Sequence, residues 1–63
     1  MQMDTQDYLK KALLDTQERV RDFMNYADQV ADQRLKKCFK DFAEQEGYMA
    51  QEIQGFLKEN DRA

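Results

Sequence analysis

The sequence of 63 residues contains no histidine, no proline and no tryptophan, and it has two glycines and one cysteine. Without histidine, the chain cannot form a Cys–His or Ser–His nucleophile, nor a metal site built from Cys and His ligands. The single cysteine, Cys38, cannot form an internal disulfide, which is typical of a protein in a reducing cytoplasm. We therefore expect a cytoplasmic protein with no enzymatic activity and no cofactor, in which Cys38 is a small buried hydrophobic residue.

Long apolar runs and a strong charge of one sign are also missing. No apolar stretch approaches the roughly 20 residues that a membrane-spanning helix needs, and no signal peptide opens the chain. Ten basic and thirteen acidic side chains give a net charge of −3. This charge argues against general affinity for nucleic acid or for an anionic membrane. We expect neither of them as a partner.

Good helix formers, mainly Gln, Glu, Asp, Lys, Ala and Leu, make up most of the chain, and 37% of its residues are charged. This composition is typical of solvated helices and predicts an all-α fold. The length allows one domain, residues 1–63. Chains shorter than roughly 70 to 80 residues seldom bury enough core alone, and self-association is a common remedy.

Apolar residues recur in steps of four and three along two segments, which is the spacing of a heptad seam. The first seam consists of Leu9, Leu13, Thr16, Val20, Phe23, Ala27 and Val30. The second consists of Leu35, Phe39, Phe42, Glu46, Met49, Ile53 and Phe56. Gly47 does not interrupt the second seam, so we expect that helix to be continuous.

A turn is expected between the two seams, although no glycine or proline marks it. Asp28 and Asp32 suit a turn, and Asp32 also suits the N-cap of the second helix, as Asp4 suits that of the first. The sequence predicts a helix over about 4–30, a turn over about 28–32 and a helix over about 33–60. A single unbroken helix is the alternative, but the step of five from Val30 to Leu35 shifts the seam and favours the hairpin.

An antiparallel hairpin folded about residues 31 and 32 pairs Phe23 with Phe42 and leaves several flanking apolar residues without a partner. These flanking residues are Tyr8, Leu14, Met24, Tyr26, Cys38, Tyr48 and Leu57. Two hairpins can cover them as an antiparallel four-helix bundle, so we expect a homodimer or a higher oligomer. The predicted dimer core consists of Leu13, Val20, Phe23, Phe39, Phe42, Met49, Ile53 and Phe56.

One acidic residue, Glu46, interrupts the second seam, and the hairpin pairing places Thr16 opposite Glu46 and Met49. A carboxylate buried without a cation is destabilising. If Glu46 is buried in this way, we expect Glu46→Gln or Glu46→Leu to stabilise the bundle near neutral pH. The alternative is that the helix is rotated slightly, so that the Glu46 carboxylate reaches solvent at an edge.

The stretches "ALLDTQERVRDFMNYADQV" and "LKKCFKDFAEQEGYMAQEIQGFL" together resemble one half of a rubrerythrin-type ferritin-like domain. The resemblance covers most of the chain. It implies that Glu46 matches a metal-ligand glutamate, that Met49 stands where a histidine belongs, and that Thr16 stands where the first helix would supply a glutamate. The resemblance thus implies a ferritin-like architecture in which Thr16, Glu46 and Met49 are relic ligand positions and no metal is bound.

The sequence leaves three functions open. The first is a structural or interaction role of the homodimeric bundle. The second is metal binding or iron handling through Glu46 in a higher oligomer. The third is an adaptor whose seam accepts a helix from another protein. In addition, "RLKKCFK" is interpreted as a solvated face because acidic residues lie one turn away, and a phosphate-binding patch is the alternative.

Overall fold

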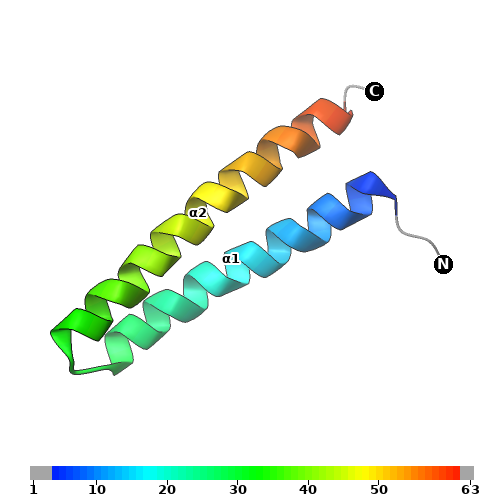
Figure 1. Cartoon of the computed structure of the whole chain (residues 1–63). Coiled ribbons are helices and arrows are strands. Elements are labelled where there is room, and N and C mark those ends of the chain that lie inside the picture. Colours follow the sequence, from blue (N-terminus) through cyan, green and yellow to red (C-terminus); the bar gives the residue numbers. More distant parts are fainter. Residues whose placement is uncertain (1–3, 62–63) are drawn as a thin grey trace.

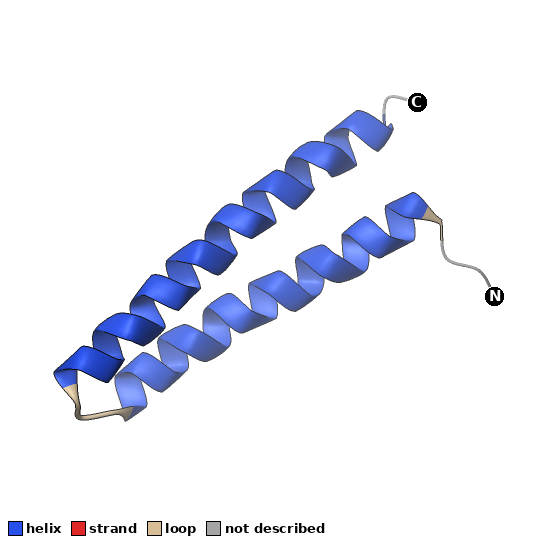
Figure 2. Cartoon of the chain, in the orientation of Figure 1, coloured by secondary structure: helices blue, strands red, loops and turns tan. Residues whose placement is uncertain are grey.

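The computed structural model describes residues 4–61, so the predicted domain extends beyond the described residues at both ends. Two antiparallel helices, α1 (Thr5–Gln29) and α2 (Gln33–Asp61), are joined by a connection at residues 30–32 (Figure 1). The described residues contain no strand (Figure 2). The helical hairpin is therefore confirmed, and the single unbroken helix is excluded.

The start of α1 is fixed by a reciprocal pair of hydrogen bonds between Asp4 and Asp7. The Asp4 carboxylate accepts from the backbone N–H of Asp7 at 2.9 Å, and the Asp7 carboxylate accepts from the N–H of Asp4 at 3.3 Å. This capping box satisfies donors that have no partner inside the first turn. The N-cap predicted at Asp4 is confirmed.

The turn is held by side chains that cap both helix ends. Asp32 Oδ1 accepts from the N–H groups of Arg34 and Leu35 at 2.8 and 3.2 Å, which confirms Asp32 as the cap of α2. Lys36 Nζ donates to the carbonyl oxygen of Ala27 at 2.6 Å, near the C-terminal end of α1. A cation is favourable there because the last carbonyls of a helix carry partial negative charge. Lys36, one of the basic residues of the stretch "RLKKCFK", therefore stabilises the turn.

The seam predicted for α1 faces α2 at all seven positions. Thr16 and Ala27 are buried, and the other five positions are half-buried: Leu9, Leu13, Val20, Phe23 and Val30. The spacing of four and three residues keeps these side chains along one side of the helix. The apolar pattern of α1 therefore predicted its packing correctly.

The seam predicted for α2 is wrong at Leu35, Met49 and Phe56, because the helix is rotated. Phe42 is also partly exposed but packs against Phe23 of α1 as predicted. Phe39, Glu46 and Ile53 lie toward α1 as expected. The positions between them are taken by Lys36, Ala43, Ala50 and Leu57, while Leu35, Phe42, Met49 and Phe56 are 41 to 56% exposed. Small residues such as Ala43 allow two helix backbones to approach closely, which explains the choice of face. Leu57, predicted to lie on a flank, is half-buried instead.

The hairpin buries very little. Among the described residues the buried apolar side chains are Ala27 and Ala43, and the largest fully buried side chain is that of Thr16. Nine large hydrophobic side chains within residues 4–61 are more than 40% exposed: Tyr8, Leu14, Met24, Tyr26, Leu35, Phe42, Tyr48, Met49 and Phe56. Two helices of this composition therefore form a layer with two broad sides and almost no interior.

Candidate functional site

The most distinctive polar group of the hairpin is a cluster of Thr16, Arg19 and Glu46 between the helices. Thr16 is 1% exposed, and its hydroxyl donates to the carbonyl oxygen of Ala12 at 2.7 Å. Arg19 Nε donates to Glu46 Oε1 at 2.9 Å, and Arg19 Nη2 lies 3.5 Å from Thr16 Oγ1. The structure thus brings Thr16 and Glu46 together through Arg19. Met49, the third predicted ligand position, is 48% exposed and lies outside this cluster.

Arg19 is the cationic partner of Glu46, and this pairing was not predicted from the sequence. The Glu46 side chain is 17% exposed and the Arg19 side chain 45% exposed, so the pair lies at the edge of the helix interface. The hydrogen bond to Glu46 raises the pKa of Arg19 above its ordinary value, and the guanidinium stays charged. A signal was available in the sequence, because an antiparallel pairing of Phe23 with Phe42 also pairs Arg19 with Glu46.

Glu46 is therefore not buried without a cation, which was the condition for a stabilising replacement. Its Oε1 atom is bonded to Arg19, while its Oε2 atom is covered and has no hydrogen-bond partner within residues 4–61. The guanidinium of Arg19 compensates the charge of the mostly covered Glu46 carboxylate. Replacing Glu46 alone would leave Arg19 without its partner, so such a replacement is no longer expected to stabilise the protein.

An aromatic cluster lies on the turn side of this ion pair. The ring centroid of Phe39 lies 5.5 Å from that of Tyr26, 6.1 Å from that of Phe23 and 6.4 Å from that of Phe42. Phe23 also packs against Phe42 at 5.5 Å and against Tyr26 at 6.2 Å. Tyr26 and Phe42 remain 45 and 41% exposed. The cluster therefore extends from the helix interface to the surface of the hairpin.

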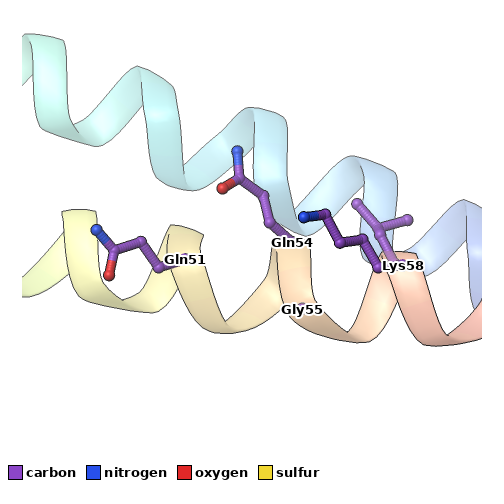
Figure 3. A pocket seen from close by; sticks show the side chains of 5 residues that line it. Gln51, Gln54, Gly55 and Lys58 are labelled. Atoms are coloured by element: carbon purple, nitrogen blue, oxygen red, sulfur yellow. The ribbon is translucent and has the colours of Figure 1, made fainter.

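Other candidate groups offer little chemistry. An open surface hollow near the end of α2 is lined by Gln51, Gln54, Gly55, Leu57 and Lys58 (Figure 3). Its single charged group is an amine, and its amides can only donate or accept hydrogen bonds. No group of three or more His, Cys, Asp or Glu side chains suited to a metal ion occurs in the described part of the chain. Cys38 is exposed in the single hairpin, as expected for a flanking residue.

The predicted dimer-core residues fall into two groups in the hairpin. Leu13, Val20, Phe23, Phe39 and Ile53 are half-buried between the helices, whereas Phe42, Met49 and Phe56 are exposed.

The described residues contain no helix with the length and apolar character needed to cross a bilayer.

No protein-family model matches the chain, and comparisons with curated proteins and with solved structures found no match either. The likeness to half of a rubrerythrin-type domain therefore rests on the sequence pattern alone.

Proposed function

We propose that the protein is a non-catalytic helical hairpin that forms a homodimeric four-helix bundle and has a structural or protein-interaction role. The observation that carries this proposal is the missing interior. In the part of the chain that the structure describes, Ala27 and Ala43 are the buried apolar residues, while nine large hydrophobic side chains are exposed. A chain of 63 residues with so little buried apolar surface does not offset the conformational entropy lost on folding. A second hairpin supplies the missing buried surface.

Two further observations support this proposal. The rubrerythrin-type resemblance fits it, because half of such a domain is a helical pair and a second copy would supply the other half. The lone Cys38 is exposed and unpaired with another cysteine, which supports a reducing compartment such as the cytoplasm.

Arg19 disfavours the alternative of metal binding or iron handling through Glu46 in a higher oligomer. A metal cation at Glu46 would be repelled by the guanidinium of Arg19, which already bonds one oxygen of the carboxylate. A dimer would also offer only two Glu46 carboxylates, and the thioether of Met49 is a poor ligand for Fe(II), Mn(II) or Zn(II).

Light scattering at micromolar concentration, combined with metal analysis of protein purified without a chelator, tests the proposal. We expect about 15 kDa, twice the 7.6 kDa of one chain, and no stoichiometric metal. A mass of one chain would contradict the homodimer and favour the adaptor that binds a helix of another protein. Stoichiometric iron, manganese or zinc would favour the metal-binding alternative.

A further inference from the structure

The exposed large hydrophobic residues in the described part of α2 are arranged in a regular way, except for Tyr48. Leu35, Phe42, Met49 and Phe56 are 42, 41, 48 and 56% exposed and follow one another at intervals of seven residues. Residues at this interval lie along one side of a helix, so the four side chains form a continuous apolar stripe. The stripe runs beside Phe39, Glu46 and Ile53, which lie toward α1. It is therefore placed at the edge of the helix interface, on one broad side of the hairpin.

The same broad side includes Arg19 and Tyr26 of α1, which are also seven residues apart. Tyr26 packs against Phe39 and Phe23, and Phe42 of the stripe packs against the same two rings. We call this side the aromatic face and define it by Arg19, Tyr26, Leu35, Phe42, Met49 and Phe56.

The opposite broad side has a different composition. Along the other edge of the interface, each helix again has a series of residues spaced seven apart. These are Lys10, Gln17 and Met24 in α1 and Lys40, Gly47 and Gln54 in α2. Met24 is the single large apolar residue in this set, which is otherwise charged, polar or without a side chain. The two sides of the hairpin therefore differ, and the aromatic face is the apolar one.

The surface area indicates how large the missing partner is. The hairpin exposes 5235 Å², whereas a folded monomer of 7.6 kDa exposes about 4,300 Å² on average. The excess of roughly 900 Å² is close to the ~800 Å² that each partner loses in a standard protein interface. The longer dimensions of the hairpin, 47 by 24 Å, provide a broad side large enough for such a contact. A second hairpin has a broad side of the same dimensions and can therefore cover this surface.

The charges on the aromatic face suit a second copy of the same chain. Arg19 and Glu46 form their ion pair near the middle of both helices, with Phe42 and Phe56 on either side of it along α2. A two-fold axis through such a face brings two cations and two anions together, so the charged layer is neutral and self-complementary. The apolar residues toward both ends of the face then meet apolar residues.

We propose that a second copy of this chain docks face to face on the aromatic face, with the two Arg19–Glu46 pairs in the central layer. The proposal rests on the homodimer proposed above and adds which side of the hairpin forms the interface.

Two methionines of similar exposure provide a matched test. Met49 lies on the aromatic face and is 48% exposed, and Met24 lies on the opposite side and is 44% exposed. We expect Met49→Glu to reduce the mass in sedimentation to that of one chain, at concentrations where the unaltered protein, Met24→Glu and Met49→Leu have the mass of two chains. Dissociation by Met24→Glu but not by Met49→Glu would overturn the assignment of the face and leave the homodimer intact. A wild-type mass of one chain would overturn both proposals.

Thiol labelling tests the same face without introducing a charge, and it applies even if Met49→Glu fails to fold. Met49→Cys and Met24→Cys are each made in a Cys38→Ser chain and treated with a soluble maleimide. We expect the thiol at position 49 to react about fivefold more slowly at total chain concentrations about ten times the dimer Kd than in dilute protein. The rate at position 24, which is already 44% exposed in the folded hairpin, should change much less. Equal protection at both positions, or protection at 24 alone, in a protein with the mass of two chains would contradict the proposed face.

Discussion

At the scale of single residues, Glu46 shows how a helix interface accommodates a carboxylate. Its side chain is mostly covered, yet Arg19 donates to it from the facing helix at 2.9 Å. Removing one partner of such a pair leaves the other charge poorly solvated, which is more costly than the pair itself. The pair therefore contributes mainly by preventing the loss that an isolated Glu46 would cause.

We expect Arg19→Ala to lower the urea midpoint of unfolding, and we expect Glu46→Gln to recover part of that loss when the two changes are combined. The reason is that the neutral amide does not require a cation. Urea unfolding of the two single variants and the double variant forms a double-mutant cycle that measures this coupling. Strictly additive changes in the midpoint would show that the two side chains do not interact in solution.

A second residue-scale prediction concerns Tyr48, whose hydroxyl donates to Glu44 Oε1 at 3.1 Å. This hydrogen bond raises the pKa of Tyr48 above its ordinary value of 10.0 because it favours the protonated phenol. The stability linked to the bond is therefore present below the ordinary pKa and is lost as pH rises through the raised pKa.

We expect Glu44→Ala to lower the pKa of Tyr48 toward its ordinary value. Phenolate absorbance reports this directly in a chain where Tyr8→Phe and Tyr26→Phe remove the other two tyrosines. An identical titration curve with and without Glu44 would mean that the bond is not formed in solution.

At the scale of the elements, the sequence predicted the helix ends and one of the two packing faces. Asp4 and Asp32 were identifiable as caps because Asp accepts hydrogen bonds from free N–H groups at helix starts. The face of α1 was also predictable, since a single apolar series runs along it. In α2 two heptad series share Phe39, Glu46 and Ile53. The predicted seam combined these three residues with the series of larger side chains, which includes Phe42 and Met49, whereas the series with Ala43 and Ala50 faces α1.

The physical reason for that error is that apolar size does not decide which side of a helix faces its nearest partner. Ala43 and Ala50 allow close approach of α1, whereas Phe42 and Met49 in their place would hold the helices apart. The large residues of α2 are thus left for a second contact. The sequence contained this second series, but one chain folded on itself could not use both.

We expect Gly47→Ala to stabilise the protein by about 1 kcal/mol, because Gly is disfavoured in a helix interior by that amount relative to Ala. A Cβ atom at Gly47 would meet nothing within 4 Å. Gly47 also lies on the side opposite the aromatic face, so the new methyl group should not disturb the dimer. Thermal unfolding at a fixed protein concentration measures the change. A lower melting temperature would indicate that a partner packs against the backbone at Gly47.

At the scale of the whole molecule, folding and association are expected to be one process. The hairpin has two buried alanines and an apolar face on its outside. Without a second copy, much of the apolar stripe stays in water and adds little to stability beyond the packing of Phe42 against Phe23 and Phe39. The charged layer of Arg19 and Glu46 would then fix the position of one hairpin on the other.

We expect Phe39→Asp to abolish both folding and association. Phe39 packs against the rings of Phe23, Tyr26 and Phe42, and losing a buried phenyl ring alone costs about 3 to 5 kcal/mol. Leu14→Asp is the control, because Leu14 is 65% exposed on the outside of α1. Circular dichroism should show a helical, cooperatively melting protein for Leu14→Asp and a largely unfolded chain for Phe39→Asp. A helical monomer with Phe39→Asp would show that the hairpin is stable alone.

The dependence of the melting temperature on protein concentration tests the central claim most directly. If the folded state is a dimer and the unfolded state a single chain, mass action stabilises the folded state as the concentration rises. We therefore expect the wild-type melting temperature, followed by circular dichroism, to rise steadily over a roughly hundredfold increase in concentration. A melting temperature that stays constant over this range would contradict the account, because it would show that one hairpin folds without a second copy.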